Sequence, residues 1–131
     1  MFNASNDVEI DSAFATMVEQ KVKAALVTSS PLYLPLRHRF IVLAARYAIP
    51  TVYYVRDFAD DGGLLSYGTS LDDAYRQEGV YAGRVLKGEV ARDLPIQQSV
   101  KVELVINLKT AKALGLVFPL TLLGRADQVI E

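Results

Sequence analysis

The residues best suited to hold a small polar molecule follow the two most strand-like runs of the sequence. Ser29 and Ser30 come directly after residues 24–28 (AALVT). Arg56 comes directly after residues 51–55 (TVYYV). Ligands of open α/β sheets bind beyond the carboxyl ends of the strands, where hydroxyl groups and a guanidinium group can hold a polar or carboxylate-bearing solute. Turn chemistry alone would select the same residue types, so a structural role, with Arg56 paired to the aspartate that follows it, stays open.

The sequence contains no recognisable catalytic constellation. His38 is the only histidine, and it lies between two arginines on the polar side of a predicted helix. A hydrolase site would need Ser29 or Ser30 as the nucleophile and His38 as the base, but there is no nucleophile elbow and no third member. We therefore expect a solvated surface histidine and predict that the protein is not an enzyme.

The sequence also lacks the patterns of metal and cofactor sites. Asp60 and Asp61 are adjacent carboxylates in a predicted loop without a third oxygen ligand at useful spacing, so solvated turn residues are expected. The absence of cysteine excludes zinc–thiolate sites. Neither phosphate-binding pattern, GxxxxGK[ST] or GxGxxG, occurs. No metal and no cofactor are predicted.

Composition and charge exclude further classes of protein. The 131 residues include 14 basic and 15 acidic side chains, giving a net charge of −1. Because the basic residues form no stripe, a nucleic-acid partner is not expected. No apolar run approaches the ~18 residues of a membrane span, and the amino terminus lacks the basic start and apolar run of a secretory signal.

The first third of the chain is predicted to form two strands and the helix between them. Residues 8–10 are predicted to be a short strand, and the helix that follows is capped by Asp11 or Ser12. Residues 24–28 form a short apolar run, typical of a strand that is buried on both faces.

The next elements complete a strand–helix–strand unit. Apolar residues at helical spacing predict a helix over residues 36–47, and residues 51–55 are rich in β-branched and aromatic side chains. Such a unit predicts a parallel sheet in a doubly wound, Rossmann-like α/β fold.

A turn-rich connection over residues 56–68 contains a short predicted strand, residues 64–66. Ser70 and Asp73 form a capping box for a helix that stops at Gly88. This helix also carries Gly79 and Gly83. Each glycine costs up to ~1 kcal/mol relative to alanine, which predicts close packing against another backbone.

The last part of the chain is predicted to begin with a strand that runs directly into a helix. In residues 100–106, Val102 and Leu104 alternate with Glu103, the pattern of a half-buried strand. Asn107 is the predicted amino-terminal cap of the following helix, and Gly115 is its stop.

Four stretches of the sequence together resemble one protein family. They are DFADDGGLLSYG (57–68), AYRQEGVYAGRVLKGEVARDLPIQQS (74–99), VELVINLKTAKALGL (102–116) and LLGRADQVIE (122–131). They are similar to the C-terminal half of ABC-transporter substrate-binding proteins, in the largely uncharacterised group that includes tryptophan- and tyrosine-type binders. Asp57, Leu65 and Leu120 depart mildly from the family pattern, which tends to have glutamate, methionine and proline there.

The resemblance implies a two-lobed binder of the type I periplasmic fold that closes on a small solute, such as an amino acid, and delivers it to a membrane permease. The chain would then be a single partial domain with three parts. These are residues 1–61 as the βαβ part of the second lobe, 62–99 as the lobe crossing with a helix of the first lobe, and 100–131 as the final strand and C-terminal helices.

The resemblance and the strand-end argument together predict five ligand contacts: Ser29, Ser30, Arg56, Ser66 and Tyr67. The last two lie at the predicted crossing, where the Tyr67 ring could stack on a solute or simply fill the edge of the sheet.

The resemblance implies a periplasmic location, whereas the lack of a signal peptide leaves the cytoplasm open. Without a first lobe, apolar faces would be uncovered, which predicts a homodimer, with or without exchange of the segment after Gly68. The alternative function is a dimeric α/β interaction module that has lost ligand binding and transport.

Overall fold

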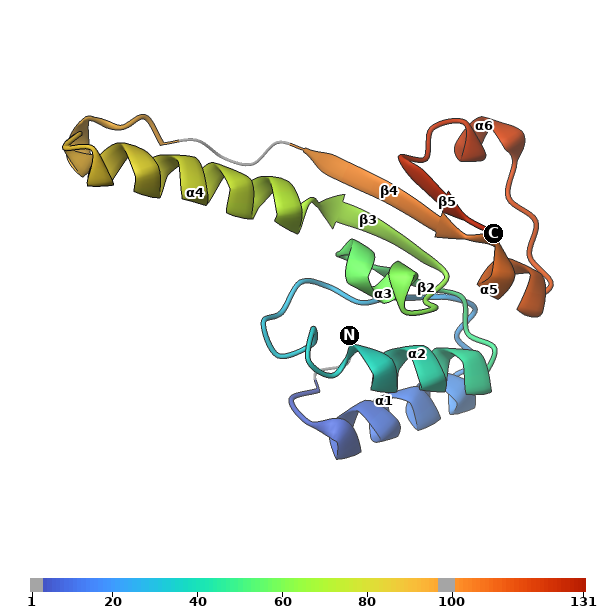
Figure 1. Ribbon diagram of the computed structural model, residues 1–131. Helices are drawn as coiled ribbons and strands as arrows, with labels where there is room; N and C mark the ends of the chain where they lie inside the picture. The colour runs from blue at the N-terminus through green and yellow to red at the C-terminus, as the bar shows by residue number, and fades with distance from the viewer. Residues whose placement is uncertain (1–3, 97–100) are drawn as a thin grey trace.

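The computed structural model describes residues 4–96 and 101–131, which form six α-helices around a five-stranded sheet (Figure 1). The helices are α1 (Asp7–Glu19), α2 (Arg37–Arg46), α3 (Arg56–Asp60), α4 (Leu71–Leu86), α5 (Leu108–Ala113) and α6 (Leu120–Leu123), with a 3₁₀ turn at Ala91–Asp93. The strands are β1 (Ala25–Leu26), β2 (Thr51–Tyr53), β3 (Leu65–Thr69), β4 (Val102–Asn107) and β5 (Gln128–Ile130).

The strands lie side by side in the order in which they occur in the sequence. β1, β2 and β3 are mutually parallel, as the strand–helix–strand pattern predicts, and β5 is parallel to β4. The α/β fold class is therefore confirmed. The prediction of a wholly parallel sheet is wrong at one place, because β3 and β4 are antiparallel. The chain leaves the sheet at the end of β3, passes along α4 and returns beside the strand it left. β4 is also not the last strand, since β5 follows α6.

The predicted strand at residues 8–10 is instead the first turn of α1. The Asn6 side chain accepts a hydrogen bond from the Glu9 N–H at 3.0 Å, and the Glu9 carboxylate accepts one from the Ser5 N–H at 2.6 Å. The Asn6 cap begins the helix five residues earlier than Asp11 would. Ile10 and Phe14, one turn apart, form its buried face.

A series of aromatic rings connects the helices to the sheet. Phe14 of α1 lies 6.4 Å from Phe40 of α2, which lies 6.3 Å from Phe58 of α3 between ring centroids. Phe58 stacks on Tyr53 of β2 at 4.6 Å. Aromatic pairs of this kind stabilise beyond the apolar area they bury, so the series holds α1, α2 and α3 against β2.

Two predictions of strand burial are wrong. β1 was predicted to be buried on both faces, but Leu26 is 68% exposed because β1 lies at the edge of the sheet with only β2 beside it in the described chain. In β4, Val102 is 46% exposed while Glu103 is buried. Helix α3 packs across β3 and β4 and covers the face that carries Glu103.

Part of the predicted turn-rich connection forms the five-residue helix α3. Arg56 is therefore helical rather than part of a loop. Phe58 and Ala59 are fully buried, so tertiary packing stabilises a helix that is too short to be stable alone.

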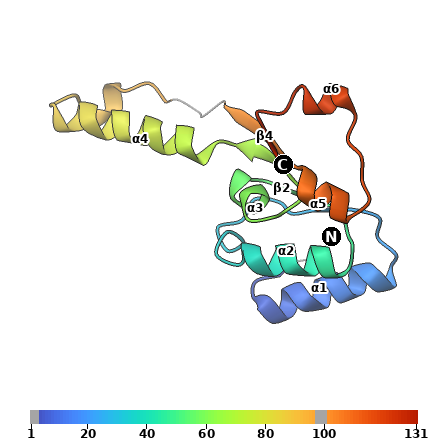
Figure 2. The ribbon, with the colours of Figure 1, turned by 45° about the vertical axis from the view of Figure 1, so that its right-hand side comes forward.

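Helix α4 projects away from the other helices, at the end of the β3–β4 ribbon (Figures 1 and 2). Its cap is the predicted one, with the Ser70 hydroxyl oxygen accepting from the Asp73 N–H at 3.3 Å. Among the described residues, no α4 side chain is buried, and nothing lies within 4 Å of the position that a Cβ atom would take at Gly79 or Gly83. The close backbone packing expected at these glycines is thus not found within the described chain.

Candidate ligand-binding site

A hollow of about 390 Å³ lies where three segments meet: the loop before α2, helix α3 and the first turns of α4. Its lining combines charged, apolar and aromatic side chains. They are Leu34, Arg56, Asp57, Asp60, Leu71, Asp72 and Tyr75. Its volume is in the ordinary range for small-molecule sites.

Arg56 is the only basic side chain of this lining, and it connects three elements. Its Nε donates to Asp60 Oδ2 at 3.1 Å, and its Nη2 donates to Gln128 Oε1 of β5 at 2.5 Å. Its Nη1 lies 3.6 Å from Glu103 Oε2 of β4. The Asp60 hydrogen bond is the main cause that raises the pKa of Arg56. The guanidinium group is thus a fixed positive charge at the wall of the hollow, and its carboxylate partner is Asp60 rather than the neighbouring aspartate.

Two buried polar atoms lie on the β3–β4 face that α3 covers. Ser66 pairs with Val105, and Glu103 pairs with Gly68, so their side chains share one face of the ladder. Ser66 Oγ and Glu103 Oε2 are buried and have no hydrogen-bond partner among the described residues. Glu103 was missed because strand alternation assigned it to solvent. A glutamate inside the apolar run VELVIN was the available signal.

Ser29 and Ser30 do not line the hollow, although Leu34 of the same loop does. Ser29 is exposed. The Ser30 hydroxyl accepts from the Leu32 N–H at 3.3 Å, and the Ser30 carbonyl accepts from the Tyr54 hydroxyl at 3.0 Å. These contacts are the turn chemistry that the sequence left open for this segment.

Ser66 and Tyr67 are neighbours on β3, so their side chains point to opposite faces of the sheet. Ser66 is buried beneath α3, whereas Tyr67 is 63% exposed on the other face. The structure therefore does not bring Tyr67 together with Arg56. The tyrosine of the hollow is Tyr75, which is also 63% exposed. The capping box at Ser70 could have indicated it, because it places Leu71 and Tyr75 on one side of α4.

The remaining polar candidates lie at the surface. His38 has a side chain that is 68% exposed, and its Nε2 lies 3.6 Å from an Asp61 oxygen that also accepts from Arg37 at 2.5 Å. Within residues 4–96 and 101–131, no group of three or more acidic, histidine or cysteine side chains could hold a metal ion. None of the helices described for this chain combines the length and the apolar composition of a membrane span.

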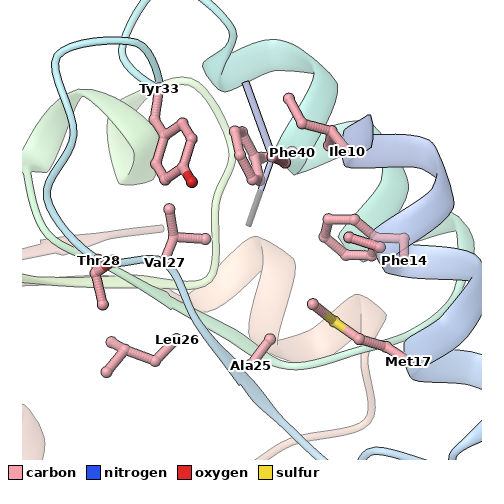
Figure 3. Close-up of a pocket in the computed structure, with 11 residues that line it drawn as sticks. Ile10, Phe14, Met17, Ala25, Leu26, Val27, Thr28, Tyr33 and Phe40 are labelled. Atoms are coloured by element: carbon pink, nitrogen blue, oxygen red, sulfur yellow. The ribbon is translucent and has the colours of Figure 1, made fainter. Parts of the chain in front are cut away.

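A second cavity, of about 70 Å³, lies between α1 and β1 and is too small for a solute of amino-acid size (Figure 3). In the close-up, Phe14 and Met17 of α1 lie across from Val27 and Ala25 at the edge of the sheet. None of the five predicted contact residues lines it.

Solved structures share this fold. The chain superposes on an ABC domain in complex with L-Trp from Streptococcus pneumonia with a TM-score of 0.86 and 27% identity, covering 98% of this chain and 44% of that one. A conserved domain protein from Vibrio cholerae matches with a TM-score of 0.84 and 23% identity over 96% of this chain and 42% of that one. A ligand-free, open substrate-binding protein with adhesive properties from Clostridium difficile matches with a TM-score of 0.64 and 20% identity, over 97% and 42%.

This chain thus spans less than half the length of the solved structures it matches. A comparison with curated proteins found no match. The family model described as "ABC transporter substrate binding protein" matches residues 1–130, nearly the whole chain. The chain therefore belongs to the ABC transporter substrate-binding protein family.

Proposed function

We propose that this protein binds a small solute, such as an amino acid, for an ABC-type uptake transporter, and that the hollow beside Arg56 forms part of the ligand site. The observation that carries the proposal is the hollow itself, in a fold shared with a protein whose structure holds L-Trp. The family consists of solute-binding proteins, which supports a binding role rather than catalysis.

The lining of the hollow suits a zwitterion with an apolar side chain. Asp57 and Asp72 offer carboxylate oxygens to an ammonium group, and the Arg56 guanidinium lies nearby for a carboxylate. Tyr75, with Leu34 and Leu71, offers aromatic and apolar surface for the side chain. Ser29, Ser30, Ser66 and Tyr67 remain predicted contacts outside this lining.

The β3–β4 ribbon is proposed as the crossing between two lobes, with α4 contributing to the first lobe and residues 1–61 to the second. The projection of α4 from the sheet supports this division (Figure 1). Members of the family usually act in the periplasm or outside the cell. We therefore propose that location and a membrane permease as the functional partner.

A titration of ¹⁵N-labelled protein with L-Trp, L-Tyr and L-Leu, followed by NMR, tests the site even if binding is weak. Amide signals of α3 and of the first turn of α4 should shift. Tyr75→Ala should weaken binding by about tenfold, which corresponds to ~1.4 kcal/mol of lost contact. Tyr67→Ala is the comparison variant: this tyrosine is equally exposed but lies on the face of β3 away from the hollow, so the two variants separate binding in the hollow from binding at the predicted Tyr67 contact.

Two outcomes would overturn the proposed site. One is the absence of shifts with all three amino acids at millimolar concentration. The other is loss of binding in Tyr67→Ala with full binding in Tyr75→Ala, which would favour the opposite face of the ribbon.

A second candidate function, a dimeric interaction module without transport, is supported by Tyr75 and Leu86 of α4, two large apolar side chains that are exposed within the described residues. A homodimer is compatible with both functions.

A further inference from the structure

The hollow beside Arg56 is lined by more negative than positive charge. Asp57, Asp60 and Asp72 contribute three carboxylates, and Arg56 contributes the only guanidinium group, so the lining carries a net charge of −2. A concave surface that is lined mainly by one sign of charge concentrates ions of the opposite sign. The hollow therefore favours a solute group that carries a positive charge.

The guanidinium group of Arg56 is not free to clamp a carboxylate. The strongest contact of this kind uses two parallel N–H donors. In Arg56, the edge formed by Nε and Nη2 is divided between Asp60 Oδ2 at 3.1 Å and Gln128 Oε1 at 2.5 Å. On the other side, Nη1 lies 3.6 Å from Glu103 Oε2. Arg56 can still attract a carboxylate by its charge, but its directional contacts are made within the protein.

The carboxylates of Asp57 and Asp72, in contrast, remain available to a solute. In the part of the chain that the structure describes, no ion pair or side-chain hydrogen bond involves either group, because Arg56 and Arg76 are paired with other aspartates. Asp57 lies in the first turn of α3 and Asp72 in the first turn of α4, so the two carboxylates reach the hollow from different elements. An ammonium group, with its three N–H donors, can bond to both.

The rest of the lining selects the kind of cation. Among residues 4–96 and 101–131, no three acidic, histidine or cysteine side chains are placed to hold a metal ion. Tyr75, Leu34 and Leu71 instead offer aromatic and apolar surface. The face of an aromatic ring attracts an organic cation and also packs against its hydrocarbon body. An amine with an aromatic or aliphatic body therefore suits the hollow better than an inorganic cation does.

We propose, building on the function proposed above, that the hollow recognises its solute mainly through the ammonium group and that the carboxylate is dispensable. The solute class would then include aromatic and aliphatic amines as well as amino acids. A carboxylate in the hollow would lie among three aspartates and would gain only the undirected charge of Arg56. Repulsion of acids thus contributes to the specificity together with attraction of amines.

Two analogues of L-Trp separate the contributions of its charged groups. Tryptamine lacks only the carboxylate, and indole-3-propionate lacks only the amino group. In NMR titrations of the ¹⁵N-labelled chain, tryptamine should shift the amide signals of α3 and of the first turn of α4. It should bind within about threefold of L-Trp or more tightly, and indole-3-propionate should bind at least about tenfold more weakly than tryptamine.

A pair of neighbouring aspartates supplies the variant and its matched control. Asp72→Asn should weaken tryptamine binding by about fivefold, because it removes one charged contact. Asp73→Asn removes the same charge from the same helical turn, but the Asp73 carboxylate already accepts from Arg76 at 2.6 Å and from Gln77 at 2.8 Å and does not line the hollow. This control should change tryptamine binding by less than about twofold.

Three results would overturn the inference and leave the proposed site intact. The first is L-Trp that binds in the hollow more than about threefold more tightly than tryptamine, and the second is indole-3-propionate that binds within about tenfold of tryptamine. The third is an equal effect of Asp72→Asn and Asp73→Asn, which would indicate only a general attraction to the charge of the protein. The absence of shifts with tryptamine and with all three amino acids would instead overturn the proposed site itself.

Discussion

The backbone carbonyl of Tyr54 occupies the space in which a side chain at Gly68 would begin. A Cβ atom at Gly68 would lie 1.8 Å from Tyr54 O, a contact that no rotamer change can relieve because the obstacle is backbone. Tyr54 directly follows β2, and Gly68 lies in β3. The absence of a side chain at Gly68 therefore allows the two segments to approach each other where the chain begins its excursion to α4.

We expect Gly68→Ala to destabilise the protein by about 3 kcal/mol or more, because overpacking against backbone forces the strands apart. Gly83→Ala is the control, since nothing lies within 4 Å of its Cβ position. That change should be neutral or stabilise α4 by up to ~1 kcal/mol. Urea unfolding of the two variants measures the difference. Equal stabilities would contradict the close approach.

Asn107 should prove important for stability because it makes two different contacts. Its Oδ1 accepts from the Thr110 N–H at 3.1 Å as the cap of α5, and its Nδ2 donates to the buried Ala59 carbonyl of α3 at 3.1 Å. Asn107→Ala should cost roughly 1–3 kcal/mol, the sum of a lost cap and one lost hydrogen bond to the Ala59 carbonyl, which still accepts from the Gly62 N–H at 3.1 Å. Asn107→Ser keeps a capping oxygen but cannot reach Ala59, so it should cost less. If the serine and alanine variants unfold at the same urea concentration, the cap contributes nothing.

Removal of Arg56 should destabilise the fold even without ligand, because Glu103 is 9% exposed and would lose one of two cationic neighbours, keeping Lys101 Nζ at 3.4 Å. We expect about 1–2 kcal/mol for Arg56→Ala, less than for a fully buried pair because Arg56 is partly exposed. Adding Glu103→Gln should recover part of this loss by removing the buried charge. A double variant that is less stable than Arg56→Ala alone would show that Lys101 is sufficient to stabilise the Glu103 carboxylate. Denaturant unfolding of the single and double variants provides the comparison.

The contact between α1 and α2 should make stability depend on acid pH. Hydrogen bonds from Arg39 lower the pKa of Asp11 below its ordinary value of 3.8. A carboxyl group with a lowered pKa contributes stability that is fully present above the unfolded-state value and lost as the pH falls through the folded-state value. The stability difference between wild type and Asp11→Asn should therefore shrink as the pH falls from about 5 to about 2. Arg39→Met should remove the same part of the pH dependence of stability, because Asp11 would then lack its partner. A stability difference between wild type and Asp11→Asn that stays constant from about pH 5 to about pH 2 would contradict the pairing.

The elements that could be predicted are those with strong local signals. The Ser70 cap, the spacing of Phe40 and Leu43 in α2, and the Asn107 cap all lie within the element they define. Helix α3 could not be predicted, because its five residues are held in place by the packing of Phe58 against other elements, Phe40 of α2 and Tyr53 of β2. The prediction of an amino-terminal strand was wrong for another reason: it placed the helix cap at Asp11 or Ser12, whereas the residues that cap the helix, Asn6 and Glu9, lie before and within the short β-like run.

The candidate site was predicted only in part. The strand-end argument located Arg56, because parallel strands present their carboxyl ends at one edge of the sheet. It could not locate Tyr75 or Asp72, which reach the hollow only because α4 starts beside α3. The burial of Glu103 likewise depends on α3 crossing β4, and this packing leaves no trace in the local alternation of the strand.

The ladder between β3 and β4 extends to the start of α4, where the Ser70 N–H donates to the Lys101 carbonyl at 2.9 Å. Helix α4 is therefore anchored at its base by paired backbone rather than by a single flexible peptide. A paired ribbon bends and twists as a unit more easily than it swivels. Motion of α4 relative to the sheet should thus involve both strands of the ribbon, including β4, whose Glu103 lies 3.6 Å from Arg56.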